Sequence, residues 1–432
     1  MKIKKEFAKY VSLNILGMVG MSCYILADTY FISKSQGTLG IAALNLVLPL
    51  YNIIYGIGDM IGIGSAIQYS ITKIRDNNDA ECYLFNALVF TAMLGLVFTM
   101  IGLFAPEKLL RMLGADDAVI MTGKEYTRIF MTFGPVFMWN MVANAYCRND
   151  HAPMVSMLST LISSLFNIVF DYVLMFPLGM GMKGAALATA LSPVLGIAIC
   201  MSHFLSKKSN VKLKICVPSF KRLLRSCQVG ISAFVGHVSA GVTTIVYNYI
   251  ILSIVGNTAV AAYGIIANIA LVVIAVFNGL SNGCQPLVSR DYGAGKHDNV
   301  KTLKNLSFFV SLVLSVILYA VIFLNADTLI GIFNSENDQE LYHYAHLGVR
   351  LYFIGIIFAS VNIIGASFFS ATNQAKNASV ISLLRGFVLI VVFAGIFSKL
   401  FGLNGVWISY AAGEAVTTWV MFILLSKKQQ AV

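Results

Sequence analysis

The chain has 432 residues, of which 58% are hydrophobic and only 11% are charged, and its net charge is +11. A soluble protein of this size would carry charge on close to a quarter of its residues. Together with a mean hydropathy of +0.79, this composition excludes a soluble domain and predicts an integral membrane protein.

Long apolar runs follow one another along the whole sequence, each about the 20 residues that an α-helix needs to cross a bilayer. The runs are continuously apolar, whereas the strands of an outer-membrane barrel would alternate. We therefore predict an all-α membrane protein. The first run follows a basic N-terminus and is long enough to be a retained helix rather than a cleaved signal. Twelve transmembrane helices are expected, at roughly 11–33, 41–70, 84–104, 128–148, 154–176, 184–205, 227–253, 259–288, 305–325, 346–371, 379–400 and 403–425.

The basic residues are unevenly divided between the two sides of this predicted arrangement. If the N-terminus is inside, the inside segments hold 21 of the 30 Lys and Arg residues, and the outside segments hold 7. The positive-inside rule then predicts a multi-pass protein of the cell (plasma or inner) membrane with both termini in the cytoplasm. The excess positive charge would face anionic lipid headgroups of the bilayer, so it requires no nucleic acid partner.

A basic linker at 206–225 divides the chain into two halves of six predicted helices, an N lobe at 1–205 and a C lobe at 226–432. Six helices per repeat give both halves the same topology. We therefore expect two pseudo-symmetric lobes related by an axis along the membrane normal, with the functional site between or inside them. Three motifs recur at offsets of 219 to 224 residues: Gly37-Thr-Leu-Gly with Gly256-Asn-Thr-Ala, Gly181-Met-Lys-Gly184 with Gly402-Leu-Asn-Gly405, and Arg148-Asn-Asp-His151 with Thr372-Asn-Gln-Ala375.

Two carboxylates lie inside predicted spans of the N lobe. Asp28 and Asp171 each precede the outer end of an outward-running helix by about five residues, and Thr189 follows the outer start of the next helix by about five, which places all three roughly 8 Å below the outer face. Asn167 lies one turn before Asp171 on the same helix face, as Tyr24 lies one turn before Asp28. The sequence therefore predicts an oxygen-rich pocket at one depth in the N lobe.

Such a pocket has two possible ligands. Carboxylate, amide and hydroxyl oxygens suit a hard cation such as Na⁺, and two nearby carboxylates can instead share a proton. Either ligand would convert an ion gradient into a conformational bias. The alternative is structural: Asp28 or Asp171 only pairs with a neighbouring helix, while Asn167 and Thr189 only make interhelical hydrogen bonds.

Further polar residues inside the spans are candidates for substrate binding or gating. Asp59 could attract a cationic substrate or pair with Arg385. His237 could change its charge near physiological pH, but a buried histidine satisfied by a hydrogen bond is the alternative. At the offsets of the two N-lobe carboxylates the second half has Tyr247 and Val392, so no matching pocket is expected there. The full set of these candidates is Tyr24, Asp59, His237, Gln285, Arg385 and Glu414.

The seven cysteines form no C-x-x-C pair and no cluster with histidine. Most of them lie within or beside the predicted spans. We interpret them as small buried residues and expect neither a disulfide nor a metal site.

In combination, several motifs resemble the multidrug and toxic compound extrusion (MATE) family. They are Ala27-Asp28-Thr29, Asn167-x-x-x-Asp171, Gly181-x-x-Gly184-Ala-Ala-Leu-Ala-Thr189, the segment from Gly283-Cys-Gln285-Pro286 to Gly295, and Gly402-Leu-x-Gly405-Val406-Trp407. The resemblance covers nearly the whole chain. It implies a V-shaped bundle of twelve helices, with a cation site of the N lobe at Asp28, Asn167, Asp171 and Thr189.

The resemblance further implies a secondary active multidrug exporter, not an enzyme, that exchanges amphipathic, cationic compounds for Na⁺ or H⁺ by alternating access. We expect a monomer with no cofactor besides this coupling ion. A lipid-linked oligosaccharide flippase is the alternative, because related transporters share the two lobes. A flippase would need several basic residues in its cavity to hold a pyrophosphate, and Arg385 is the clearest within a span. His237 and Glu414 alone do not form a catalytic set.

Overall fold

The computed structural model describes residues 2–74, 76–334 and 338–429. Arg75, one of the basic residues behind the predicted orientation, lies outside these ranges. Over the described ranges the chain is helical and has no strand, so the predicted all-α class is confirmed. The elements are α1 (Lys2–Thr72), α2 (Asn77–Phe104), α3 (Pro106–Met112), α4 (Asp117–Thr132), α5 (Gly134–Asn149), α6 (Pro153–Met175), α7 (Gly181–Phe204), α8 (Phe220–Ile254), α9 (Asn257–Gly293), α10 (His297–Leu324), α11 (Ala326–Phe333), α12 (Gln339–Tyr352), α13 (Gly355–Ala371), α14 (Ala375–Leu383), the π-helix η1 (Leu384–Val388) and α15 (Leu389–Gln429).

The twelve predicted spans can be identified among these elements. Eight helical segments are long and apolar enough to cross a membrane, and α12 with α13 forms a further span that is bent by 45°. Two of the eight, α1 and the segment Ala375–Ser426, each contain two spans, because the chain reverses at Gly37 and at Gly402. The remaining span is α4 with α5, which is divided at Phe133.

The structure departs from the prediction at the two divided spans. The expected runs at 128–148 and 346–371 are each interrupted, at Phe133 and Phe353, and the short helices α3 and α11 were not expected. Pro135 explains the first interruption, because proline has no N–H to continue the hydrogen bonding of the preceding turn. The two interruptions lie 220 residues apart in matching helices, so the halves share this irregularity.

The hairpin turns of the two halves match in backbone conformation. Gly37 and Gly256, at the first hairpin of each half, have φ of 61° and 125°. Gly181 and Gly402, at the last hairpin, have φ of 52° and 58°. This region of φ is readily open only to glycine, which is why the glycines recur in the sequence.

One proposed correspondence was out of register. The sequence alignment of the motifs after the fourth and tenth spans pairs His151 with Ala375. Among the described residues other than glycine, however, the two with positive φ are His151 and Asn373, at 60° and 58°. The turn conformation therefore aligns His151 with Asn373, two residues away. Sequence letters in a polar turn vary, whereas the conformation that the turn requires is kept.

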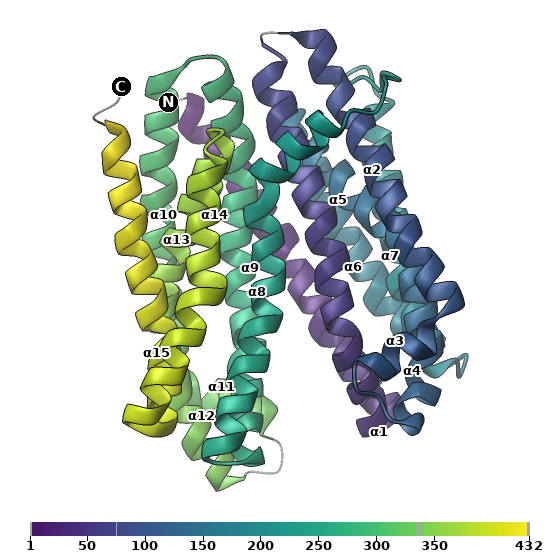
Figure 1. Cartoon of the computed structure of the whole chain (residues 1–432), viewed down its shortest axis with the longest axis vertical. Helices are drawn as coiled ribbons and strands as arrows, with labels where there is room; N and C mark the ends of the chain where they lie inside the picture. Colours follow the sequence, from purple (N-terminus) through teal and green to yellow (C-terminus); the bar gives the residue numbers. More distant parts are fainter. Residues whose placement is uncertain (1, 75, 335–337, 430–432) are drawn as a thin grey trace.

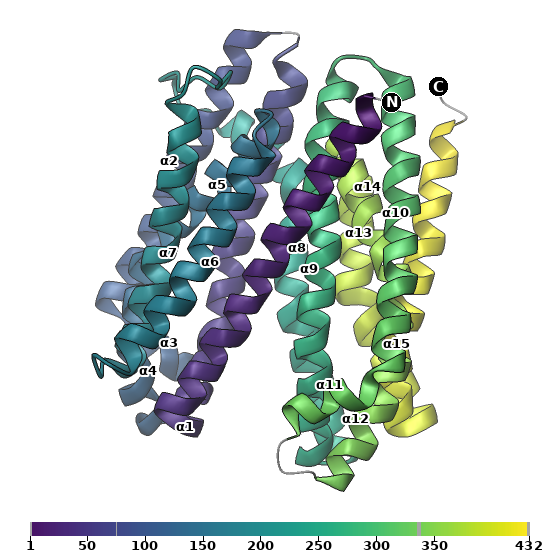
Figure 2. The same ribbon diagram turned by 180° about the vertical axis from the view of Figure 1, so that it is seen from behind.

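The helices form two bundles that lie side by side (Figures 1 and 2). The N lobe holds α1 to α7, and the C lobe holds α8 to α15. Both termini lie at the same end of the molecule, and the ribbons of the two bundles diverge toward the opposite end (Figure 1). The first part of α1 runs obliquely from the C lobe at the terminal end to the N lobe (Figure 2).

Glycines bring the lobes together toward the end that carries the termini. A Cβ at Gly283 of α9 would lie 2.8 Å from the Tyr10 carbonyl oxygen of α1, and a Cβ at Gly64 of α1 would overlap the Ser226 carbonyl of α8. We call these two approaches the inter-lobe contact. On the same helix, Gly58 and Gly62 let α1 approach α5, whereas Gly64 lets it approach α8.

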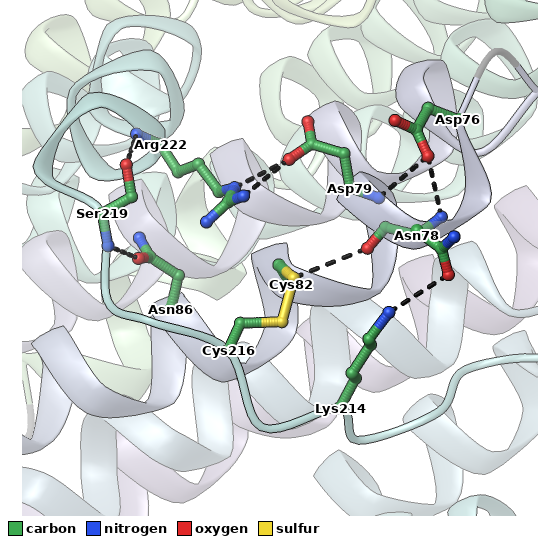
Figure 3. The surroundings of a disulfide bond; sticks show 9 residues. All are labelled: Asp76, Asn78, Asp79, Cys82, Asn86, Lys214, Cys216, Ser219 and Arg222. Carbon is green, nitrogen blue, oxygen red and sulfur yellow. Dashed lines mark hydrogen bonds and ion pairs between the residues drawn. A yellow bond between two sulfur atoms is a disulfide. The ribbon is translucent and has the colours of Figure 1, made fainter.

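The linker between α7 and α8 folds back over the start of α2 (Figure 3). Cys216 of the linker forms a disulfide with Cys82 of α2, 134 residues away. The expectation of no disulfide is therefore wrong. Cysteine spacing could not reveal this pair, because only the return of the linker brings the two residues together. Of the other cysteines, Cys147, Cys200 and Cys284 are buried as predicted, but Cys227 is only partly buried and Cys23 is exposed, so the prediction is wrong for Cys23.

Candidate functional site

The two predicted carboxylates face each other inside the N lobe. Asp28 comes from α1 and Asp171 from α6, both are buried, and their carboxyl groups are close enough to interact. The Oδ1 atom of each is buried and receives no hydrogen bond from the described part of the chain. Two ionised carboxylates can only accept. A proton or a cation between them would supply the missing partner.

Asn167 and Thr189 complete this pocket. The Asn167 side chain is fully buried one turn before Asp171, and its Nδ2 donates to Thr189 Oγ1 at 3.3 Å. When the Asn167 amide is turned over, its Nδ2 lies 3.0 Å from Asp171 Oδ2 and its Oδ1 lies 3.2 Å from the Thr189 amide nitrogen. The second orientation satisfies both ends of the amide. The structure thus brings together all four residues that the sequence singled out, which we call the acid pocket.

The hairpin between α6 and α7 sets the depth of the acid pocket. Gly179 and Gly181 turn the chain with positive φ, and Gly184 then lets α7 approach α6 closely. A Cβ at Gly184 would lie 2.9 Å from the carbonyl carbon of Leu174. This close packing fixes the relative height of the two helices, and therefore brings Thr189 level with Asn167.

A group of tyrosines lies beside the acid pocket. The Tyr24 and Tyr51 hydroxyls are 2.9 Å apart, and Tyr51 stacks on Tyr55 with ring centroids 4.0 Å apart. Tyr126 of α4 is buried close to Thr189. Of these, the sequence indicated Tyr24 alone. Tyr51 and Tyr55 carried a signal that was missed, since their i, i+4 spacing places both on one helix face.

The C lobe has no carboxylate at the corresponding place. Tyr247 stands at the offset of Asp28, and its hydroxyl lies 2.8 Å from the Ser409 hydroxyl, 220 residues after Thr189. Both are buried. Val392, at the offset of Asp171, is exposed on the surface of the helices. The symmetric position is thus filled by a neutral hydrogen-bonded pair.

Asp59 and His237 pair across the two lobes. Asp59 Oδ2 on α1 lies 2.9 Å from His237 Nε2 on α8, and both side chains are partly exposed, at 21% and 27%. The expected alternative partner of Asp59, Arg385, is engaged elsewhere, so that pairing is wrong. Gln285 is buried on α9, two residues from the inter-lobe contact at Gly283.

Arg385 and Glu414 form an ion pair inside the C lobe. Arg385 Nη2 donates to Glu414 Oε1 at 2.8 Å, and Asn362 Nδ2 donates to Glu414 Oε2 at 2.7 Å. Glu414 is 1% exposed. Arg385 lies in the π-helix η1, a rare local geometry that is often associated with function. In contrast to the carboxylates of the acid pocket, the Glu414 carboxylate is already paired with a positively charged side chain, Arg385.

Comparison with known proteins identifies the family. The MatE family profile matches residues 14–173 and 233–423. The chain belongs to the MatE family. It is therefore a membrane transporter of the MATE type and not an enzyme.

Similar proteins cover nearly all of this MATE chain. The multidrug export protein MepA of Staphylococcus saprophyticus is 25% identical over 95% of this chain and 91% of its own length, and MepA of Staphylococcus aureus matches to the same extent. A multidrug resistance MATE transporter solved in an outward-facing conformation superposes with a TM-score of 0.92, at 23% identity, over 99% of this chain and 96% of its own. A transporter of the MOP superfamily from Pyrococcus furiosus gives the same values. These structures confirm the two-lobed fold.

Proposed function

We propose that this MATE transporter exports amphipathic, cationic compounds across the cell membrane in exchange for Na⁺ or H⁺ bound in the acid pocket. The observation that carries the proposal is the pair of buried Oδ1 atoms of Asp28 and Asp171, which have no hydrogen-bond partner in the part of the chain that the structure describes. Burying charge inside a membrane protein is expensive, and such residues usually mark ion or substrate sites. The name of the MepA relatives as multidrug export proteins supports the substrate class.

The orientation of the protein follows from its charge. The 21 to 7 excess of Lys and Arg in the predicted inside segments supports a cytoplasmic position for the side of the termini. The lobes meet toward this side and diverge on the other (Figure 1). The conformation described is therefore an outward-facing one, with the acid pocket in the outer part of the N lobe.

Alternating access explains how the pocket drives export. A cation bound between Asp28 and Asp171 neutralises the pair, and this favours one arrangement of the lobes over the other. By thermodynamic reciprocity, if the cation weakens substrate binding, then substrate weakens cation binding by the same factor. The ion gradient thus drives release of substrate on the outside. A single such pocket, with a neutral counterpart at Tyr247 and Ser409, supports coupling through the N lobe.

Asp59 is our candidate for attracting a cationic substrate. It lies between the lobes with its carboxylate partly exposed, and its partner among the described residues is His237. A permanently cationic compound can replace His237 as its partner. The flippase alternative is less well supported, because Arg385, which would hold a pyrophosphate, is bound by Glu414.

Dye efflux from proteoliposomes tests the proposal. Wild type should move a fluorescent cationic dye under a Na⁺ gradient at fixed pH, or under a proton gradient without Na⁺, and the active gradient identifies the coupling ion. Asp28→Asn and Asp171→Asn should each lower gradient-driven accumulation by about 5–150-fold, the usual range of a coupling free energy.

The matched control is Asp117→Asn, which removes a carboxylate whose side chain is 83% exposed on an outer helix and should leave efflux unchanged. Full gradient-driven export by both pocket variants would refute the assigned role of the carboxylates. Absence of dye movement in the wild type under either gradient would refute the multidrug function.

A further inference from the structure

A line of buried polar side chains leads from the acid pocket toward the side of the termini. On α6 it consists of Ser156, Ser159, Ser163, Asn167 and Asp171, all of them buried. Their spacing of three or four residues places them on one face of the helix. From Ser156 to Asp171 this face covers about 22 Å at 1.5 Å per residue. That length is most of the thickness of a bilayer core.

Helix α5 contributes a second set with the same spacing: Asn140, Asn144 and Arg148. Ser156 Oγ donates to Asn144 Oδ1 at 3.0 Å, and Asn144 Nδ2 donates to Asn140 Oδ1 at 3.0 Å. Arg148 Nη1 lies 3.4 Å from Ser156 Oγ at the end nearest the termini. We call this set, together with the α6 residues from Ser156 to Asn167, the polar column.

The middle of the polar column is built around Gly196 of α7. A Cβ at this position would lie 2.7 Å from Asn140 Oδ1, 2.9 Å from Ser163 Oγ and 3.1 Å from Ser159 Oγ. Three oxygens thus converge where α7 has no side chain. Ser163 is 8% exposed, and its hydroxyl has no hydrogen-bond partner in the described part of the chain. Buried hydroxyls of this kind are normally satisfied by water.

Ser163 is also the place where the column is incomplete. It lies one turn from Asn167 of the acid pocket and one turn from Ser159, which donates to the Gly196 carbonyl at 3.0 Å. A water on the free Ser163 hydroxyl would join the acid pocket to the lower part of the column. The N lobe would then contain a continuous polar route from the coupling site to the cytoplasmic side.

Such a route would uncouple cation flow from substrate export. A cation that entered the acid pocket from outside could leave along the column without any movement of the lobes, and the gradient would be lost. The only basic side chain among the described residues assigned to the column is Arg148, which is 8% exposed and stands at its cytoplasmic end. A fixed positive charge in a narrow polar passage excludes cations, as arginines do in selective pores.

From this geometry we infer that Arg148 is the electrostatic barrier that keeps the coupling cation from leaking through the N lobe. The inference rests on the proposed role of the acid pocket. It assigns Arg148 a task separate from binding: it touches neither carboxylate of the pocket and closes the far end of the route. The ionisable groups that act on it electrostatically are Asp59 of α1, Cys147 of α5 and Cys200 of α7.

A purely structural role for Arg148 is the competing explanation, since a basic residue in the last turn of a helix interacts favourably with the helix dipole. The two explanations differ in one measurable respect. Loss of a structural residue lowers stability, whereas loss of a charge barrier raises the passive cation flux of a folded protein. The test therefore measures flux in the absence of any substrate.

Passive H⁺ and Na⁺ fluxes are measured in proteoliposomes with a trapped pH dye and with radioactive sodium. Arg148→Gln should raise the flux of the coupling ion by about tenfold or more over wild type. Arg148→Lys, which keeps the charge, should not raise it. The double variant Arg148→Gln with Asp171→Asn should return the flux to the wild-type level, because the route begins at the pocket. The matched control is Lys208→Gln, which removes an exposed basic residue from the linker.

A titratable variant separates charge from folding. Arg148→His should leak little at pH 6 and more at pH 8, where the imidazole loses its proton, in the same protein preparation and with wild type as the reference at both values. Flux equal to wild type in Arg148→Gln, and in Arg148→His at pH 8, would overturn the inference. Flux that persists after Asp171→Asn would overturn it as well. Dye efflux by the wild type is measured separately, and its absence would refute the proposed function alone.

Discussion

Two buried carboxylate sites, one in each lobe, show how the environment of a single residue decides its use. Glu414 is held by the Arg385 guanidinium and the Asn362 amide, so its charge is compensated in every state that keeps these bonds. Asp28 and Asp171 face each other without a basic partner in the hydrogen-bond pattern of the described chain. The first arrangement already contains its positive charge, and the second is where we propose that a proton or a cation binds.

The compensated pair should be important for stability when it is broken on one side. Arg385→Met leaves Glu414 buried without its cation, and we expect a loss of about 3–5 kcal/mol in the free energy of unfolding. The double variant Arg385→Met with Glu414→Leu should regain most of it, because no buried charge remains. Thermal unfolding in detergent measures both. Arg111→Met, in the exposed pair with Asp117, should change stability by no more than about 1 kcal/mol. Equal losses in the single and double variants would contradict this explanation.

At the scale of single residues, the sequence identified Asp28, Asn167, Asp171 and Thr189 because polar groups stand out in apolar spans. It did not identify Tyr51, Tyr55 and Tyr126, because tyrosine is common in membrane helices and gives no such contrast. Nor could it choose the partner of Asp59. That choice depends on which helices touch, and α1 touches α8 at His237.

At the scale of elements, the linker before α8 is held to the N lobe by several bonds besides the disulfide. Directly after the linker, the Arg222 guanidinium in the first turn of α8 donates to the Asp79 carboxylate at 2.8 and 2.9 Å. The Asn86 side chain accepts from the Ser219 amide at 2.7 Å (Figure 3). Near the start of the linker, Asp150 accepts from the Asn210 amide at 3.0 Å. The linker is therefore an ordered part of the N lobe and not a loose tether.

We expect the disulfide to protect this linker from proteolysis. Cys216→Ser, or reduction of the wild type, removes the covalent attachment of the linker to α2 and leaves only the weaker bonds. Trypsin should then cut at the exposed lysines of the linker several-fold faster, because local opening exposes such segments to proteases. Limited proteolysis followed by mass spectrometry of the fragments measures the rate. Cys227→Ser, which removes a free cysteine, is the control. The prediction fails if oxidised and reduced protein are cut at the same rate.

At the scale of the whole molecule, the glycines at the inter-lobe contact determine how closely the lobes approach. Gly64 of α1 faces the Ser226 backbone, and Gly230 of α8 faces the Met60 backbone in return. Neither position can hold a methyl group without separating α1 from α8. The contact therefore acts as a close-fitting seal on the side of the termini.

Gly64→Ala should weaken this seal. The added methyl forces α1 and α8 apart, and we expect the free energy of unfolding to fall by about 1–3 kcal/mol, as is typical of an overpacked contact. The distance between spin labels attached at the exposed positions Lys208 and Lys301 should increase. Gly264→Ala is the matched control, since a Cβ there meets open space and the residue is also helical. An unchanged label distance together with unchanged stability would show that the lobes do not depend on this approach.

The sequence by itself determined the class of this protein, its twelve spans, the division into two lobes and the residues of the acid pocket. Each of these follows from local chemistry: the length of the apolar runs, the uneven distribution of charge, the recurring glycines, and the high free-energy cost of a carboxylate inside a membrane span. Only the tertiary structure decided the pairs that join distant segments, such as Cys82 with Cys216, Asp59 with His237, and Arg385 with Glu414. The reason is physical: local sequence fixes helices and their polar faces, but partners are chosen by which helices pack together.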